Sequence, residues 1–386
     1  MTSLLGPARP EVVAVSPPPA PAAPADSVTR PPRWRRAAGR VTLVATGLWL
    51  GYVVTHPFLS GRFWWMLLPD LAPPFLFVAM PLVLAALVPL ASCRRVRAVT
   101  ALLATVALLA GVPQAGLRLP GGAPTVPAGA IKVVSWNTQF WEQDEDPAAF
   151  YDYLRRFDAD VYLLQEYLYF TDAPRPIDKL AEIKREFPGY EIVANSELIT
   201  LSRLPIVSSR ALDGSAWLSA ERGSAPPPGT DFLPYWTTKT LRTDIVVGGG
   251  TVAFYNVHIP VQLDGGRSPF TGRFYSVIRE QSARREASWR ALTADLDTVS
   301  GPALVSGDFN STSAMGELDV LRDRLRQQEV TSGGLYPSTW DARGHGWWRL
   351  DHVFAGGSLD VYTYDIRDSA GLSDHKAQEL KVGLRH

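Results

Sequence analysis

The chain has 386 residues, of which 46% are hydrophobic and 20% charged, a composition that excludes a disordered chain and a disulfide-stabilised miniprotein. Its single cysteine, Cys93, excludes an internal disulfide and any zinc site built from cysteines. The net charge of zero combines +7 over residues 1–116, from 10 Lys and Arg against 3 Asp and Glu, with −7 over residues 117–386, which argues against a general nucleic-acid binder.

Residues 1–40 are rich in proline and arginine. They contain nine of the 32 prolines and end in a basic cluster, Arg30, Arg33, Arg35, Arg36 and Arg40. Such a segment buries too little apolar surface to order itself. We therefore expect a disordered tail over residues 1–40.

Three windows without Asp, Glu, Lys or Arg follow this tail. Residues 41–61, 71–93 and 98–117 are 21, 23 and 20 residues long, and a helix needs about 20 apolar residues to cross a membrane. Buried core helices and a signal peptide are the alternatives, but forty basic, proline-rich residues before the first window do not resemble a signal peptide. We predict three transmembrane helices over residues 41–117. Two helices are the main alternative, because prolines make the entry to the second window irregular.

The distribution of basic residues predicts the orientation of these helices. Arginines gather in the tail and at residues 94–97, whereas the loop between the first two windows has only Arg62, beside the aromatic residues 63–65. The positive-inside rule then places the N-terminus in the cytoplasm. Three crossings leave the C-terminal domain outside, so we predict a multi-pass protein of the cell membrane, with a short linker over residues 118–130.

From residue 131 onward, short apolar strands alternate with a few helices. Helices are expected over residues 147–157, 177–187 and 276–296. Strands are expected over residues 131–136, 160–165, 191–194, 198–202, 240–247, 251–257, 303–306, 350–355, 359–364 and 378–382. Many short strands with few long helices favour one α+β layered domain over residues 131–386 rather than a parallel doubly wound sheet.

Several of these strands end on a residue able to bind a metal ion or a phosphate. The endings are Ser135-Trp136-Asn137, Gln165-Glu166, Asn256-Val257-His258, Gly307-Asp308-Phe309-Asn310, Leu350-Asp351 and Ser373-Asp374-His375. Any one of them alone is explained as well by a cap, a turn or a buried histidine. Together they predict one site at an edge of the sheets, where rigid elements fix the ligands.

Phosphoryl hydrolysis needs these residue types. An anionic phosphoester repels an attacking water, so a hard divalent cation, Mg²⁺ or Mn²⁺, must neutralise it, and we expect Glu166 with Asn137 to hold that ion. We expect Asp308, with Asn310 beside it, to orient and deprotonate the water.

Histidines are the candidates for the third task, the stabilisation of charge on the phosphate. His258 and His375 are the available donors to the charge that develops on the phosphoryl oxygens. A carboxylate such as Asp351 fixes the tautomer of a histidine in this role and raises its basicity. The sequence offers no obvious carboxylate partner for His258.

In their order along the chain, these motifs resemble the endonuclease/exonuclease/phosphatase superfamily. The resemblance covers residues 131–384 and rests on Trp136-Asn137, Leu164-Gln165-Glu166, Leu201-Ser202-Arg203-Leu204-Pro205-Ile206, Asn256-Val257-His258, Gly307-Asp308-Phe309-Asn310, Trp348-Arg349-Leu350-Asp351 and Ser373-Asp374-His375. It implies a four-layered α/β sandwich, in which two central mixed β-sheets are flanked by helices, and hydrolysis of phosphoester bonds with one or two metal ions.

The resemblance also implies roles residue by residue. It implies a metal region at Asn137, Glu166 and Asp374. It implies a catalytic group of His258, Asp308, Asn310, Asp351 and His375. Arg203 and Asn256 are the candidate substrate contacts, with a structural role as the alternative for Arg203. One departure is His352, which follows Asp351 where an aromatic residue is common.

Three membrane helices followed by an outer domain of this superfamily resemble the VanJ-type teicoplanin-resistance proteins. This second resemblance implies contact with the lipid bilayer and action on a lipid-linked phosphate or pyrophosphate of cell-wall synthesis. The alternatives are an extracellular nuclease or a sphingomyelinase-like phosphodiesterase with the same site, and a non-catalytic module. The acidic outer half disfavours the nuclease.

Overall fold

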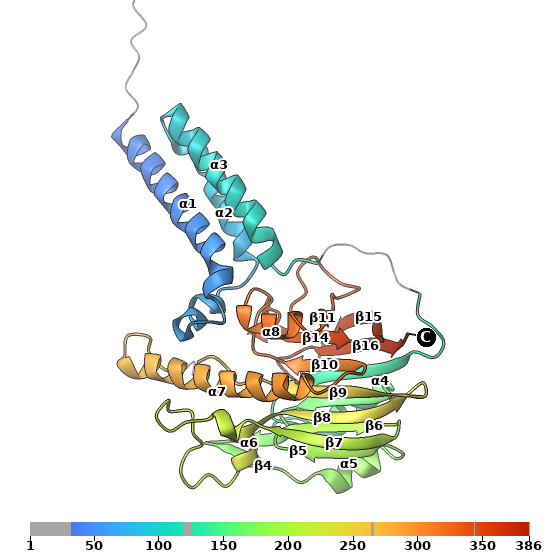
Figure 1. Cartoon of the computed structure of the whole chain (residues 1–386). Coiled ribbons are helices and arrows are strands. Elements are labelled where there is room, and N and C mark those ends of the chain that lie inside the picture. The colour runs from blue at the N-terminus through green and yellow to red at the C-terminus, as the bar shows by residue number, and fades with distance from the viewer. Residues whose placement is uncertain (1–31, 119–124, 264–265, 343, 386) are drawn as a thin grey trace, which may run out of the picture.

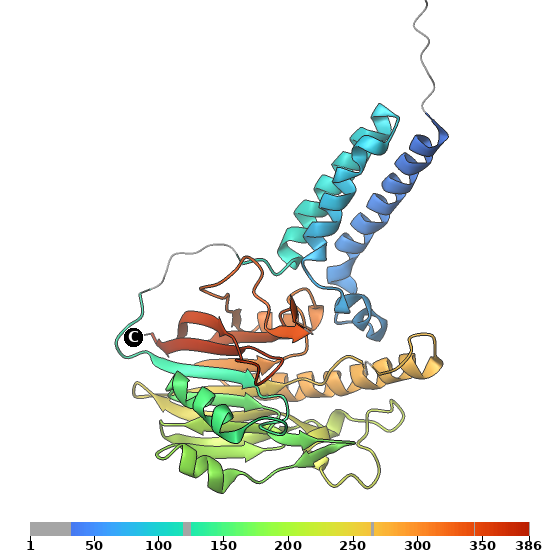
Figure 2. The same cartoon turned by 180° about the vertical axis from the view of Figure 1, so that it is seen from behind.

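The computed structural model describes residues 32–118, 125–263, 266–342 and 344–385. Most of the predicted tail, residues 1–31, and the glycine- and proline-rich part of the predicted linker, residues 119–124, lie outside these ranges. Three helices stand to one side of a larger body that contains two stacked sheets (Figures 1 and 2).

The three helices of the N-terminal part are α1 (Arg33–Leu59), α2 (Leu76–Ala86) and α3 (Arg94–Gly111). α1, and α3 with the turn that extends it to Gln114, are long and apolar enough to cross a membrane. The third candidate is a pair of segments, Trp64–Leu71 and Leu76–Leu90, bent by 62°. The structure thus has two such helices, or three if the bent pair forms one span.

Two expectations for this region are corrected. α1 begins at Arg33, so the end of the predicted disordered tail is helical, because arginine favours a helix almost as strongly as leucine does. The second window is interrupted, because Pro73 and Pro74 lack the amide hydrogens that a continuous helix needs. A second break follows at the turn Val88–Leu90, which contains Pro89, so α2 is only 11 residues long.

The outward faces of α1 and α3 expose large apolar side chains. Val41, Leu48, Leu102 and Leu109 are each more than half exposed. Water-facing surfaces rarely expose apolar side chains in continuous patches of this kind. Lipid hydrocarbon is the medium that accommodates such helices.

Two six-stranded mixed sheets form the body of the C-terminal domain. The strand order of the first sheet is β15 (Leu359–Arg367), β16 (Ala377–Leu384), β1 (Ile131–Asn137), β2 (Val161–Gln165), β6 (Leu198–Ser202) and β5 (Glu191–Asn195). The strand order of the second sheet is β11 (Arg326–Gln327), β14 (Asp351–Gly356), β10 (Ala303–Asp308), β9 (Gly250–His258), β8 (Thr238–Val247) and β7 (Ile206–Asp213). Two further two-stranded sheets pair β3 (Leu168–Phe170) with β4 (Pro174–Pro176) and β12 (Trp340–Ala342) with β13 (His345–Trp348).

The two large sheets pack face to face, and helices cover their outer faces. Val133 and Leu163 of the first sheet meet Phe254 and Leu304 of the second in a fully buried core. The first sheet is covered by α4 (Pro147–Phe157) and α5 (Leu180–Glu186), and the second by α7 (Gly272–Leu296) and α8 (Asp319–Arg322). A short helix, α6 (Leu233–Thr237), precedes β8. The domain is the four-layered α+β sandwich that the sequence predicts.

The longest element absent from the sequence-based prediction is β7. It pairs only with β8, at an edge of the second sheet. Residues 207–210 of this strand are exposed, and they include Ser208, Ser209 and Arg210. An edge strand of this kind lacks the alternation of apolar and polar residues by which a strand is recognised.

A buried amide joins the two sheets close to the ends of their strands. Asn256 of β9 is fully buried, and its Nδ2 donates to the main-chain carbonyls of Leu164 (2.9 Å) and Ile199 (3.0 Å) in the first sheet. Its Oδ1 accepts from Nε2 of Gln165 at 2.6 Å. A buried amide is tolerated because its hydrogen-bonding groups are paired. These bonds fix β2 and β6 against β9.

We expect Asn256→Ala to destabilise the domain, because two carbonyls and the Gln165 amide would lose a buried partner, at about 1–3 kcal/mol for each group left unpaired. The unfolding midpoint of the detergent-purified chain should fall by roughly 5 °C or more. The matched control is Asn195→Ala, at an exposed position of β5. Equal midpoints for the two variants would contradict this role of Asn256.

Candidate active site

Polar side chains from both sheets meet where four strands end. β1 and β2 run parallel, as do β9 and β10, so each pair brings its C-terminal residues to one edge. Asn137 pairs with Gln165 in register, and Asp308 pairs with His258. β14 runs antiparallel to β10 and begins at Asp351, opposite Asp308. The edge therefore collects residues that are far apart in the sequence.

Asp308 lies at the centre of this cluster and is almost fully buried. Its Oδ1 accepts from the main-chain amide of Asn310 at 2.7 Å, and its Oδ2 accepts from the side-chain amide of Asn137 at 3.0 Å. The Nε2 atoms of His375 and His258 lie 3.5 and 3.7 Å from Oδ2. These contacts fix the orientation of the carboxylate, which a group that orients a water requires.

His375 stands between two carboxylates. Its Nδ1 lies 2.9 Å from Oδ2 of Asp351, which is fully buried, and its Nε2 faces Asp308. Burial by itself lowers the pKa of His375, but the charges of Asp351 and Asp308 raise it to about 10. The two carboxylates therefore favour the protonated form of His375, in which both ring nitrogens are hydrogen-bond donors.

His258 has the same arrangement on the other side of Asp308. Its Nδ1 lies 3.2 Å from Oε2 of Glu197, and its Nε2 lies 3.8 Å from Oε1 of Glu166. Burial by itself lowers the pKa of His258, but the neighbouring carboxylates, that of Glu197 above all, raise it. The expectation that His258 lacks a carboxylate partner is therefore wrong.

Glu197 is the site residue that the sequence analysis misses. It lies in the turn between β5 and β6, is almost fully buried, and forms an ion pair with Lys239. Burial by itself raises the pKa of Glu197, but Lys239 and His258 lower it to about 2. The signal for Glu197 is its place directly before β6, because β6 runs antiparallel to β2 and starts opposite Gln165.

Glu166 directly follows β2 and occupies a left-handed backbone conformation, with a φ of 61°. Its Oε1 accepts from Nδ2 of Asn137 and its Oε2 from the main-chain amide of Phe140, both at 3.0 Å. Burial raises the pKa of Glu166. Phe140 and Asn310 also have positive φ. Such conformations cost about 1–3 kcal/mol each and concentrate at functional sites.

The cluster faces a cavity of about 530 Å³, a volume typical of small-molecule sites, which span about 300–1,000 Å³. Its polar lining is Gln139, Glu166, Gln262, Asp308, Asn310, Thr312, Asp374 and His375. Its apolar lining is Phe140, Val261, Leu263, Trp340, Trp348 and Leu350. Asp70 and Leu71, from the segment between α1 and α2, complete the lining.

The donor set fits a hard divalent cation, because carboxylate oxygens from Glu166, Asp308 and Asp374 line one cavity. Asp308, Asp351 and His375 also place ligand atoms within 4.8 Å of one another. In that triad both ring nitrogens of His375 already face carboxylates. Asn137 lies beside Glu166 as expected, but its amide nitrogen points between the carboxylates while its oxygen accepts from the amide of Gln139 at 3.0 Å.

Both candidate substrate contacts are corrected by the structure. Arg203 follows β6, at the end opposite to Glu197, where it pairs with Asp158 and Asp160. Because β6 is antiparallel to β2, this end lies at the other edge of the sheet from Glu166. Asn256 is buried between the sheets and does not face the cavity.

His352 does not belong to the cluster either. It is fully buried, its Nε2 lies 2.8 Å from the carbonyl oxygen of Ser311, and its ring packs near Phe309 and Phe354. Burial and the charge of Arg349 lower the pKa of His352 well below its usual value. It is a neutral histidine of the core.

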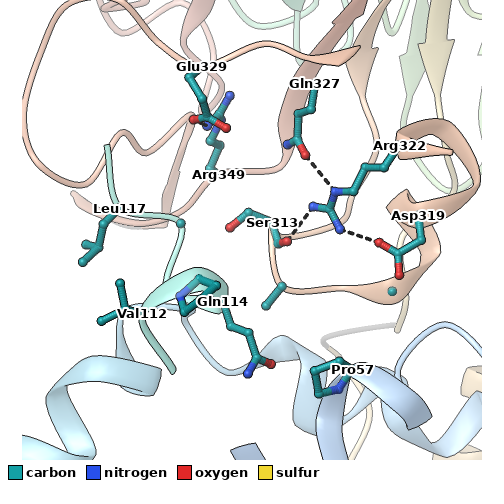
Figure 3. A pocket seen from close by; sticks show the side chains of 14 residues that line it. Pro57, Val112, Gln114, Leu117, Ser313, Asp319, Arg322, Gln327, Glu329 and Arg349 are labelled. Carbon is teal, nitrogen blue, oxygen red and sulfur yellow. Dashed lines mark hydrogen bonds and ion pairs between the residues drawn. The ribbon is translucent and has the colours of Figure 1, made fainter. Parts of the chain in front are cut away.

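A second cavity, of about 410 Å³, lies between the N-terminal helices and the C-terminal domain (Figure 3). Arg322 is part of its lining. The guanidinium donates to Asp319 (2.8 Å), to Gln327 (2.8 Å) and to the carbonyl of Ser313 (2.7 Å). None of the described residues that line it is a histidine. Asp308, Asn310 and His375 line the first cavity instead.

A model of the Endonuclease/Exonuclease/phosphatase family matches residues 134–375. The chain belongs to this family. The match contains the whole strand-end cluster, from Asn137 to His375. Members of the family are typically phosphoesterases or nucleases, and they generally use a divalent metal ion.

Solved structures of this fold resemble the chain at low identity. An endonuclease/exonuclease/phosphatase from Bacteroides vulgatus shares 14% identity, with a TM-score of 0.45 and coverage of 66% of this chain and 99% of that one. The human Nocturnin catalytic domain with bound sulfate shares 15%, with a TM-score of 0.44 and coverage of 68% and 97%. Sphingomyelinase C from Streptomyces griseocarneus shares 17%, with a TM-score of 0.42 and coverage of 65% and 99%. No curated protein matches the chain.

We expect Glu197→Gln to lower metal-dependent phosphoesterase activity about 10–100-fold, because His258 would lose the carboxylate that orients it. Hydrolysis of bis-p-nitrophenyl phosphate and the unfolding midpoint measure activity and folding separately. Glu221→Gln, at an exposed position, is the control. Unchanged activity of a folded Glu197→Gln variant would show that His258 needs no such partner.

Proposed function

We propose that this protein is a membrane-anchored, divalent-metal-dependent phosphohydrolase that acts outside the cell on a lipid-linked phosphate or pyrophosphate. The observation that supports it most is the composition of the first cavity. Asp308 and His375 share this cavity with apolar walls and with Leu71 of the membrane part. A substrate in which a phosphate is joined to an apolar chain matches both the polar and the apolar part of this lining.

The proposal assigns the metal ion to Glu166 and Asp374, with Asn137 orienting Glu166. A bound Mg²⁺ or Mn²⁺ ion would supply positive charge to the phosphoryl oxygens. Asp308, held by Asn310, accepts a proton from the attacking water as its oxygen bonds to phosphorus and the bond to the leaving phosphate or alcohol breaks.

The two histidines stabilise the charge of the reacting phosphate. His375 and His258 donate hydrogen bonds to its oxygens from opposite sides of Asp308. The carboxylates behind them, Asp351 and Glu197, hold both rings in place and raise the pKa of each histidine. Because the donors are fixed before the substrate arrives, little reorganisation is needed during the reaction.

The resemblance to the VanJ-type proteins extends the proposal to cell-wall lipids and to glycopeptide resistance. Expression of the chain in a teicoplanin-sensitive bacterium tests that extension. Nucleic acid is the less favoured substrate, because residues 117–386 have a net charge of −7.

We expect the full-length chain in detergent to release phosphate from farnesyl pyrophosphate, and the reaction to stop in chelator and resume with Mg²⁺. Asp308→Ala and His375→Ala should each lower the rate by about 10²–10⁴-fold, because each removes an acid–base group. Asp172→Ala, at an exposed position, is the control. Sphingomyelin and plasmid DNA are compared in parallel, and faster cleavage of either would contradict the lipid-phosphate assignment.

A reporter tests the orientation. Alkaline phosphatase fused after His386 should be active, because it folds only outside the cytoplasm and the proposal places the C-terminus there. A fusion after Ser92, in the loop expected to face the cytoplasm, should be inactive. The reverse pattern would place the active site inside the cell.

A further inference from the structure

A segment of the membrane part contributes to the lining of the first cavity. This segment, residues 60–74, joins α1 to α2, and we call it the connector; it contains two short 3₁₀ turns, Trp64–Leu67 and Pro69–Leu71. Asp70 and Leu71 of the connector share the cavity lining with Asp308 and His375. Residues 70 and 374 thus enclose the same space although they lie far apart in the sequence.

Buried hydrogen bonds fix the connector to the membrane helices. Nε2 of His56 lies 2.7 Å from Oδ1 of Asp70, and the hydroxyl of Ser60 donates to Oδ2 of Asp70 at 2.7 Å. Nδ1 of His56 lies 2.9 Å from Oε1 of Gln114, at the end of α3. Asp70, His56 and Ser60 are no more than 3% exposed. Asp70 is therefore held by His56 of α1, which in turn contacts Gln114 at the end of α3.

The connector is fixed equally to the C-terminal domain. The amide of Gly316 donates to the hydroxyl of Ser60 at 2.9 Å, and the indole of Trp348 donates to the carbonyl of Leu71 at 2.8 Å. The backbones touch so closely that a Cβ on Gly316 would lie 2.3 Å from the carbonyl oxygen of Ser60. Leu67 packs in a buried cluster against α7. The connector is thus an ordered wall between the two parts.

Apolar residues of the C-terminal domain line the same cavity as the connector. Leu71 is half-buried, as are Phe140 and Leu263, and Val261 is 46% exposed. The acid–base residues all come from the sheets, so hydrolysis itself needs no contribution from the connector. If the connector only joined the two parts of the chain, its apolar side chains would not need to lie in the cavity of the reacting groups.

We propose that the connector is the chain-binding wall of the active site, in which Leu71 contacts the first apolar units of the lipid attached to the reacting phosphate. Asp70 is a positioning residue, which holds Leu71 in place through His56 and Ser60. This inference rests on the proposed function. It adds that selection of a lipid over a water-soluble phosphoester resides in the membrane part of the chain.

The test compares a lipid substrate with a soluble one in full-length variants. Leu71→Trp should raise KM for farnesyl pyrophosphate by about tenfold or more, because the larger ring occupies the space of the chain. Its kcat/KM for bis-p-nitrophenyl phosphate should change less than about twofold. Leu71→Met, which keeps an apolar side chain of similar volume, should raise this KM much less than Leu71→Trp does. Leu82→Trp, the matched control on an exposed face of α2, should behave as the wild type.

Asp70→Asn provides the second variant. It keeps the side-chain volume but loses one of the two acceptors that His56 and Ser60 use, so we expect a smaller rise in KM for farnesyl pyrophosphate with kcat unchanged. Dioctanoyl phosphatidic acid, measured alongside, distinguishes an acyl chain from an isoprenoid chain. Equal losses on lipid and soluble substrates, or none on either, would overturn the proposal.

A measurement without turnover separates this inference from the proposed function. A prenyl pyrophosphate with a diazirine in its chain is irradiated on the Asp308→Ala variant, and the labelled peptides are identified by mass spectrometry. Labelling of residues 60–74 supports the connector as the chain-binding wall, whether or not the wild type hydrolyses the compound. Labelling confined to the lipid-facing residues of α1 and α3 would overturn it.

Discussion

The structure depends on the burial of three carboxylates at one edge of the sandwich. Asp308, Asp351 and Glu197 are each at most 1% exposed, and an uncompensated buried charge costs several kcal/mol. The compensation is an alternating series, Glu197–His258–Asp308–His375–Asp351, in which each histidine lies between two carboxylates. No member of this series stands alone, so the two sheets must hold their strand ends in a fixed relation.

That relation comes from the packing between the sheets. The series begins before β6 in the first sheet and passes through β9, β10 and β14 of the second. Asn256, which lies two residues before His258 in β9, forms hydrogen bonds that join β9 to β2 and β6. The positive φ of Glu166 and Asn310 is maintained by the same surroundings. The site is therefore rigid before a substrate binds, which is the condition under which fixed donors stabilise a transition state most effectively.

The sequence predicts those site residues that can be recognised from their position at the end of a single strand. Asp308, Asn310, Asp351 and His375 lie at or next to the ends of apolar strands, so each can be recognised from its own strand. Glu197 and Arg203 flank the same strand, β6, and the sequence does not say which end of β6 faces the site. That choice depends on the antiparallel pairing of β6 with β2, a contact between distant segments. The prediction accordingly omits Glu197 and includes Arg203.

On the proposed function, the connector lowers the free-energy cost of moving a lipid from the membrane into the site. Each CH₂ group withdrawn from hydrocarbon into water costs about 0.8 kcal/mol, so an enzyme that lifted a whole chain out of the bilayer would bind it poorly. The connector follows α1 directly at Leu59, and its residue Leu71 lies in the cavity with the acid–base groups. On the proposed function, only the first units of the chain leave the bilayer, and they move from hydrocarbon onto an apolar wall. A cavity of about 530 Å³ is sufficient for that, because the rest of the chain remains in the membrane.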